Sequence, residues 1–224
     1  ALVQNPWKAE NIYKTIRANA PDLLGAQEVE GHHWDVAANI GNDFTVVGDG
    51  TAGIAIMYRT SQLTLLENGL EKIYEQDQWG QRYVQWAHMK SNADGRAIDV
   101  FNTHLCVCGG SDLLKSARRV AEVIAMHRSS PDSLVVLTGD FNVFPGFEQS
   151  DAIKYLKGEI ENTLVPLQDT FRIADPNGNG NTFGEAGKID YVFTNVGRGV
   201  GGAWIDRTWY GEASDHFPIA ADVS

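Results

Sequence analysis

The sequence predicts an α/β fold in which two mixed, mainly antiparallel sheets pack face to face and helices flank them. Three observations lead to this prediction: strand-like segments outnumber helical ones, several strands are joined by short turns, and helical segments lie between groups of strands. Short turns join antiparallel neighbours, and helices placed between strand groups cover the outer faces of sheets. The length of 224 residues fits one domain that spans residues 1–224.

The first half of the chain is interpreted as one helix followed by a series of strands. Residues 7–19 place apolar side chains near helical spacing, and the Ala-Pro-Asp stretch that follows ends the helix. Apolar runs bounded by turn residues then predict strands. These runs fall at 23–28, 44–48, 53–59, 63–67, 82–90 and 97–105.

The second half alternates between helices and strands. An amphipathic helix is predicted over 112–127, with its apolar stripe formed by Leu113, Ala117, Val120, Ile124 and His127. The remaining predictions are a strand at 134–138, a helix at 149–157, and strands at 188–195, 202–208 and 216–223. The glycine- and asparagine-rich stretch 175–187 is predicted to be a long loop, and loops of this length in a compact domain are often functional.

The charge balance argues against some partners. A formal net charge of −11 disfavours broad capture of nucleic acid or anionic lipid, because such capture needs a basic face. A phosphate substrate remains compatible, since a bound divalent cation reverses the local sign. No apolar run approaches the ~18 residues of a membrane span, so we expect no transmembrane segment, and we expect a monomer.

The N-terminus and the two cysteines leave the cellular compartment open. The start, ALVQNPWK, lacks the basic residues and apolar centre of a signal peptide, and an initial Ala fits a trimmed fragment. Cys106 and Cys108 are spaced C-x-C. We expect two small, partly buried thiols, with a short and strained disulfide as the alternative. We expect no zinc site, because two ligands alone do not make one.

Acids, amides and histidines collect at the ends of the predicted strands. They are Glu28, Asn102, His104, Asp140, Asn142, Asp190, Asp215 and His216. Several carboxylates at one edge would repel one another, and a divalent cation resolves that conflict. Hard oxygen ligands without a thiolate suit Mg²⁺ or Mn²⁺, with Ca²⁺ as an alternative, better than zinc. The histidines then remain available for proton transfer and charge stabilisation.

Each residue has a simpler interpretation when it is taken alone. Glu28 fits a solvated strand end, Asn142 fits a turn closed by local hydrogen bonds, and an isolated His104 is more often structural than catalytic. The Asp-His pair at 215–216 fits an ordinary loop. Their joint occurrence at strand ends favours a common site.

At this point the chain resembles the endonuclease/exonuclease/phosphatase superfamily, which has the deoxyribonuclease I-like fold. The matching segments run in the family's order across residues 21–219. They are PDLLGAQEVE, GIAIMYR, DVFNTHL, VVLTGDFNVFPG, NTFGEAGKIDYVF and SDHFPI. GDFN combined with IDY and SDH is specific, whereas each alone is weak. The resemblance implies a four-layered α/β sandwich and metal-dependent cleavage of a phosphate ester.

The resemblance also implies individual roles. Glu28 is similar to the metal-binding glutamate of the family, and Asp215 to an acidic residue near the metal or the nucleophile. Asp140 and Asn142 are similar to the pair that orients the attacking water and contacts the phosphate.

The histidine roles come from the same resemblance. His216 is similar to a general base or a phosphate-stabilising histidine, and Asp190 to the carboxylate that holds its other nitrogen. His104 would stabilise the pentacovalent phosphate or protonate the leaving oxygen. The expected catalytic set is therefore His104, Asp140, Asn142, Asp190 and His216.

Two departures from the family pattern are expected. Family members begin with a strand that ends in a metal-site asparagine, and this chain starts at or after that strand, so we expect the first strand to be missing. Ala52 stands where deoxyribonuclease I has a glutamate that supports the histidine matching His104. These departures favour the alternative of a catalytically silent phosphate-ligand-binding or scaffold domain.

The sequence narrows the substrate only to a phosphate ester, with nucleic acid or a small organophosphate as alternatives. Candidate substrate contacts are Asn102, Asn142, Phe183 and Lys188. Arginines and lysines that could contact phosphate are scattered along the chain, and one of them is Arg82 in GQR at 80–82. Aromatic side chains that would stack on a base, sugar or lipid, or else pack structurally, are Trp79, Phe144, Phe147, Phe183, Trp209 and Tyr210. The DPNGNG stretch at 175–180 fits the opening of a calcium loop, but its twelfth position is Ala186.

Overall fold

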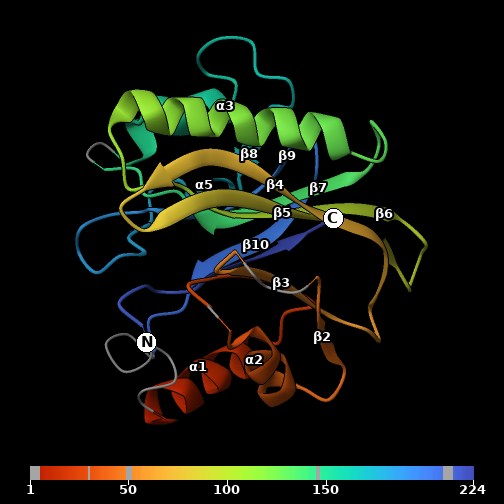
Figure 1. The fold of residues 1–224 in the computed structure, drawn as a ribbon. Coiled ribbons are helices and arrows are strands. Elements are labelled where there is room, and N and C mark those ends of the chain that lie inside the picture. The colour runs from red at the N-terminus through yellow and green to blue at the C-terminus, as the bar shows by residue number, and fades with distance from the viewer. Residues whose placement is uncertain (1–5, 30, 49–51, 145–146, 209–213) are drawn as a thin grey trace.

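The computed structural model describes residues 6–29, 31–48, 52–144, 147–208 and 214–224. Figure 1 shows α3 (Gly110–His127) over one face of a large sheet, with α1 (Pro6–Asn19) and α2 (His33–Ile40) at the opposite end of the molecule. Smaller sheets lie between these layers (Figure 1). The predicted sandwich of two sheet layers flanked by helices is confirmed.

The large sheet has six strands in the order β4-β5-β6-β7-β9-β8. They are β4 (Leu63–Asp77), β5 (Gly80–Ser91), β6 (Ala97–His104), β7 (Leu134–Asp140), β8 (Leu167–Asp169) and β9 (Asp190–Asn195). Within this sheet only the β6–β7 pair is parallel. A parallel pair needs a crossover connection, and α3 provides it.

The second sheet layer consists of two separate pieces in the described residues. One has the order β1-β3-β2, and the other pairs β10 with β11. The strands are β1 (Leu23–Gln27), β2 (Phe44–Val46), β3 (Ile54–Arg59), β10 (Val200–Ile205) and β11 (Ile219–Val223). Residues 1–5, ahead of α1, are outside the described part, so the expected missing strand stays a prediction.

A glycine allows the two sheet layers to approach closely. A Cβ built on Gly25 of β1 would lie 1.9 Å from Thr138 Oγ1 and 2.7 Å from Asn102 Oδ1. Asn102 on β6 then joins the layers, because its Nδ2 donates to the carbonyl oxygens of Ala26 and Ala55 at 2.9 and 3.1 Å. This contact fixes β1 and β3 against the middle of the large sheet.

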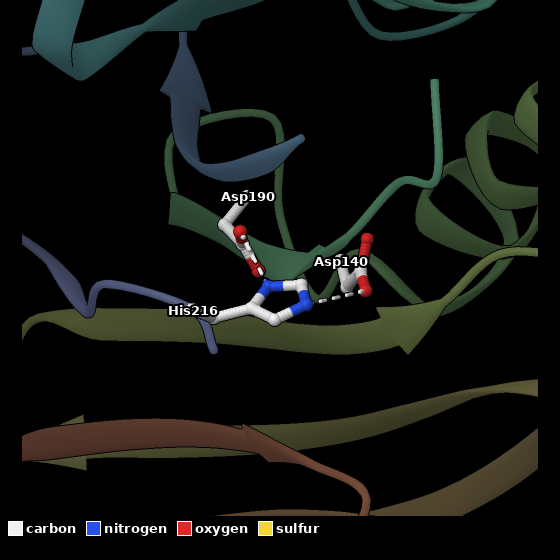
Figure 2. Close-up of side chains that lie close together, drawn as sticks. All are labelled: Asp140, Asp190 and His216. Atoms are coloured by element: carbon white, nitrogen blue, oxygen red, sulfur yellow. Dashed lines mark hydrogen bonds and ion pairs between the residues drawn. The ribbon is translucent and has the colours of Figure 1, made fainter. Parts of the chain in front are cut away.

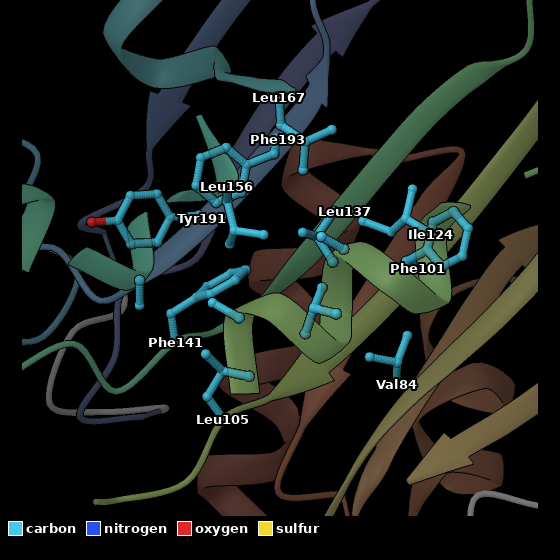
Figure 3. Packing of buried hydrophobic residues seen from close by; sticks show 14 of the residues in the cluster. Val84, Phe101, Leu105, Ile124, Leu137, Phe141, Leu156, Leu167, Tyr191 and Phe193 are labelled. Atoms are coloured by element: carbon cyan, nitrogen blue, oxygen red, sulfur yellow. The ribbon is translucent and has the colours of Figure 1, made fainter. Parts of the chain in front are cut away.

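The largest buried cluster lies between the large sheet and α3 with α4 (Asp151–Leu156), as Figure 3 shows. Phe141 is fully buried and packs edge-on against Tyr191 and Phe193, with ring centroids 5.4 Å apart in each pair. Because Phe141 follows the last residue of β7, core packing fixes the backbone that presents the Asp140 carboxylate.

Several elements differ from the sequence predictions. Helices α2 and α5 (Thr170–Ala174) and strand β8 were not predicted. The strand predicted at 63–67 continues to Asp77, although half of the added residues are exposed. Antiparallel pairing with β5 along this edge strand outweighs its polar composition. The last strand begins at Ile219 and not at residue 216, directly after Pro218, which has no N–H to donate.

The expectation of free thiols is wrong, because Cys106 and Cys108 form a disulfide. The bridge lies between the end of β6 and the start of α3, and Cys106 is fully buried in the core. Separately, no described helix is long and apolar enough to cross a membrane.

Candidate active site

Three neighbouring strands bring chemically active side chains to one edge of the large sheet. In the strand register His104 at the end of β6 pairs with Asp140 at the end of β7, and Asp140 pairs with Asp190 at the start of β9. Three residues that are 36 and 50 positions apart in the sequence therefore lie in one row. Convergence of these three strand ends is thus a consequence of register.

His216 reaches this row from the segment before β11, as Figure 2 shows. Its Nδ1 lies 2.9 Å from Asp190 Oδ2, and its Nε2 lies 4.0 Å from Asp140 Oδ2. Holding Nδ1 on a carboxylate fixes the ring orientation and directs Nε2 toward Asp140.

Thr182 fixes both partners of the His216–Asp190 pair, and sequence reasoning did not identify it. Its buried Oγ1 accepts hydrogen bonds from the backbone N–H groups of Ile189 and Asp190, each at 3.0 Å. Its carbonyl oxygen accepts from the Phe217 N–H, the residue after His216. A threonine in a long polar loop carries no sequence signal for such a role.

The electrostatics of His216 favour the charged imidazolium. Burial lowers the pKa of this ring, but the hydrogen bond to Asp190 and the charges of Asp190, Asp140 and Asp215 outweigh burial and raise the pKa to about 9. The position of His216 between two carboxylates is the physical cause.

The electrostatics of Asp140 favour its neutral form, because this acid is buried beside other carboxylates. Burial, and after it the Asp190 and Glu28 carboxylates, raise the pKa of Asp140 to about 7. The charge of His216 and the N–H of Asn142, which donates to Asp140 Oδ1 at 2.9 Å, oppose it. The site therefore concentrates more negative charge than its own residues neutralise.

His104 approaches Asp140 from the other side, with its Nε2 3.5 Å from Asp140 Oδ2. Burial and the positive charges of Arg82 and His216 lower its pKa to about 4, although the Asp77 carboxylate opposes them. His104 is thus a neutral imidazole at neutral pH. Ala52 offers no carboxylate, yet His104 still contacts one, that of Asp140.

Asn142 lies at the same edge in a left-handed backbone conformation, with φ of 47°. Its Nδ2 donates to the carbonyl oxygen of Leu105 at 2.9 Å, which ties the turn after β7 to the segment after β6. Asparagine tolerates this conformation better than most residues. The GDFN turn is therefore fixed at both of its polar side chains.

One compact group of ligand atoms occurs in the part of the chain that the structure describes. It comprises Asp140, Asp190 and His216, whose ligand atoms all lie within 4.8 Å of one another. Two carboxylates and an imidazole fit a divalent cation, and the raised pKa of Asp140 is the charge conflict that a cation relieves. Glu28 and Asp215 are exposed and outside this group, so their metal-binding role stays a prediction.

Residues 3–216 match the model of the Endonuclease/Exonuclease/phosphatase family. The chain belongs to this family. A curated relative, Protein angel of Drosophila melanogaster, is 24% identical over 209 residues, a match that covers 85% of this chain. The match covers only 59% of that protein's length.

Solved structures share the family fold. An endonuclease/exonuclease/phosphatase from Bacteroides vulgatus superposes with a TM-score of 0.83 at 23% identity, covering 98% of this chain and 90% of that one. The mannosyl-6-phosphatase of Bacteroides thetaiotaomicron has a TM-score of 0.73 at 23% identity, covering 97% and 91%. At these identities the likeness establishes the fold.

Two side chains expected to bind substrate do not fit that role. The Asn102 amide is fully buried, donates to the two carbonyls that join the sheets, and accepts from Gln27 and Thr138 at 2.7 and 2.9 Å. The Lys188 ammonium is buried and pairs with Asp169 Oδ2 at 2.8 Å. Both groups are buried and engaged in local contacts, which does not favour a direct contact with a phosphate.

Phe183 lies beside the site, as a substrate contact requires. Its ring centroid is 4.8 Å from that of His216, and the two residues form an isolated backbone bridge. Phe144 packs edge-on against Phe183 at 6.0 Å. The Phe147 side chain, Trp209 and Tyr210 lie outside the described residues.

The 175–180 loop is organised around an arginine. Arg172 Nη1 donates to the carbonyl oxygens of Asp175, Pro176 and Gly178 at 3.3, 3.5 and 2.8 Å. These carbonyls therefore already face a cationic side chain. We do not propose a calcium ion in this loop.

Proposed function

We propose that the protein is a divalent-metal-dependent hydrolase that cleaves phosphate esters by in-line attack of a water molecule. The observation that carries this proposal is the Asp140 carboxylate placed between two imidazoles, one of which Asp190 holds through Nδ1 at 2.9 Å. Phosphoryl transfer needs positioning and charge stabilisation more than covalent help. Membership of a family named for nucleases and phosphatases supports the same reaction class.

Asp140 and Asp190 would hold the metal ion through their carboxylates, with Glu28 and Asp215 as the further residues predicted from the family resemblance. When bound, magnesium or manganese supplies positive charge to the non-bridging oxygens of the phosphate. A phosphate ester can thereby bind to a protein whose net charge is −11.

The geometry supports a division of roles between the polar side chains. Asp140 orients the attacking water and accepts its proton, and Asn142 contacts the phosphate. His216, held as an imidazolium by Asp190, stabilises negative charge on the phosphate, which favours this role over that of a general base. The neutral His104 donates a hydrogen bond to the pentacovalent phosphate, in preference to delivering a proton.

The alternative is a catalytically silent domain that binds a phosphate ligand. The row of His104, Asp140 and Asp190 is intact, and Asp190 orients the His216 ring. This arrangement supports an enzyme over the alternative, because a binding site alone needs no histidine oriented by a carboxylate. The exposed Phe144 and the neighbouring Phe183 fit either function.

The test is hydrolysis of 4-nitrophenyl phosphate, bis(4-nitrophenyl) phosphate and plasmid DNA with Mg²⁺, Mn²⁺ or EDTA. His216→Ala is expected to lower kcat at least about 100-fold. His127→Ala is the matched control, because His127 Nε2 also contacts a carboxylate, that of Glu71 at 3.2 Å, but lies on α3. Turnover that survives both EDTA and His216→Ala would reject the site, and phosphate binding without any turnover would favour the silent domain.

A further inference from the structure

Two exposed apolar residues, Trp79 at the tip of the β4–β5 hairpin and Val107 in the segment after β6, are joined through one side chain. The Trp79 side chain is 74% exposed, which makes it the most exposed large hydrophobic residue in the described chain. Val107, between the two bridged cysteines, is 47% exposed. Single exposed apolar residues are common on soluble proteins, so the case depends on how this pair is held and what it borders.

One buried carboxylate fixes both residues. Asp77 Oδ1 accepts from the Trp79 N–H at 2.8 Å, and Asp77 Oδ2 accepts from the Val107 N–H at 3.0 Å. The Asp77 side chain is only 5% exposed and forms an ion pair with Arg82, whose Nη2 lies 2.8 Å from Oδ2. The two exposed side chains therefore project from neighbouring, hydrogen-bonded backbone and not from a loose loop.

This unit borders the proposed site. Val107 lies three residues beyond His104, and the charges of Asp77 and Arg82 both act on the His104 imidazole. The Cys106–Cys108 bridge constrains the backbone on both sides of Val107, while Cys106 is anchored in the core. Phe183 and Phe144 lie on the His216 side of the row. Asp77 holds the backbone of Trp79 and Val107 beyond the end of β6, on the His104 side.

Chemistry assigns a ligand to such an exposed apolar pair. An indole held by its backbone offers a flat face to another ring without a large loss of conformational freedom on binding. A charged phosphate gains little from contact with this apolar face, whereas a ring attached to the phosphate can stack on it. The pair therefore concerns the organic part of the ester.

We propose that Trp79 is a specificity-determining residue that stacks on a ring carried by the substrate next to its scissile phosphate, with Val107 contacting the edge of that ring. The inference rests on the proposed phosphoesterase function and adds the class of substrate. The shared chemistry is a flat ring, which an aromatic base or the apolar face of a sugar can supply.

The experiment compares esters that differ only in the ring. We would assay phosphate esters of phenol, a nucleoside, a hexose and propanol, each as the monoester and as the methyl diester. The variants are then compared on whichever of these two classes the wild-type protein hydrolyses. Trp79→Ala is expected to raise KM for ring-bearing esters by roughly 5- to 150-fold, with KM for the propyl ester changed less than about twofold. Trp79→Phe is expected to restore much of the loss. Comparison of the nucleoside and hexose esters identifies which ring is preferred.

Trp34→Ala is the matched control, because that indole is also exposed, at 53%, but lies on α2. The proposal is overturned if Trp79→Ala leaves KM unchanged, or if it affects ring-bearing and propyl esters equally. Quenching of indole fluorescence by phenylphosphonate in Mg²⁺, lost in Trp79→Phe, is a second readout that needs no turnover, because the C–P bond of this compound is not hydrolysed. If the wild-type protein shows this quenching but no turnover, the proposed function is rejected and the ring contact is kept. If it shows neither, both proposals are rejected.

Discussion

Asn142 and Glu28 both have left-handed backbone conformations, with φ of 47° and 56°. Non-glycine residues in this region are uncommon and raise the energy of the backbone. Here they follow β7 and β1, where the chain turns at the candidate active site. At the residue scale, two of the strained positions carry side chains for which we propose a chemical role, whereas Glu161 has the same conformation outside the site.

Asn142→Gly separates that cost from the role. Glycine adopts positive φ without strain, so the free energy of unfolding is expected to stay within about 1 kcal/mol of the wild type. Loss of the amide is expected to lower kcat about 100-fold. Chemical denaturation and steady-state kinetics measure the two effects. Glu161→Gly is the control, because Glu161 has φ of 56° outside the site and should keep full activity. Full activity in Asn142→Gly would remove this residue from the mechanism.

At the scale of the elements, the site depends on three strand ends and on the loop that joins α5 to β9. Strand register sets the row of His104, Asp140 and Asp190. The loop sets the position of His216 relative to this row, through the hydrogen bond from Phe217 N–H to the Thr182 carbonyl oxygen. The loop is polar and rich in glycine, and its buried Thr182 bonds the backbone on both sides of the His216–Asp190 pair. This part of the loop therefore supports the histidine.

Thr182→Val tests this support. Valine has the shape of threonine but accepts no hydrogen bond, so the N–H groups of Ile189 and Asp190 lose their partner. The expected cost in unfolding free energy is about 1–3 kcal/mol, and misplacement of Asp190 is expected to lower kcat roughly 10- to 100-fold.

Thr170→Val is the control for this prediction. Thr170 is also fully buried, but its Oγ1 donates to the carbonyl oxygen of Val192, in the middle of β9. We expect this variant to lose stability and keep its kcat. Equal activity loss in both variants would mean that Thr182 acts through general stability and not through positioning.

At the scale of the whole molecule, the two sheet layers must meet closely for the charge of Glu28 to act on Asp140. Glu28 follows β1 of one layer and Asp140 ends β7 of the other, and the carboxylate of Glu28 contributes to the raised pKa of Asp140. Gly25 is the position of closest approach, since its Cβ would overlap Thr138.

Gly25→Ala is therefore expected to lower the free energy of unfolding by about 1–3 kcal/mol, because overpacking forces the layers apart. Adding Thr138→Gly removes Oγ1 and Cβ, the overlapping atoms of Thr138, and should recover part of the loss. Gly109→Ala is the control, with φ of −66° and open space around the added Cβ. Thermal denaturation of the four proteins checks this, and an unchanged Tm for Gly25→Ala would contradict the close contact.

The sequence by itself determined the class of fold, most helices and strands, and the residues that end the central strands. Apolar periodicity identified α1, α3 and β7, because local spacing reflects which face of an element is buried. The same spacing carried little information on β8 and α5, which are short and gain their stability from neighbours.

Only the tertiary structure decided which polar residues share a site. Asn102 and Lys188 were plausible substrate contacts until packing placed them in buried hydrogen bonds and an ion pair. Thr182 and Asp77 had no sequence signal. Thr182 positions Asp190 through its side chain and His216 through its carbonyl oxygen, and the Asp77 carboxylate holds the backbone of Trp79. Burial and pairing depend on contacts between residues far apart in the chain, so a local pattern cannot report them.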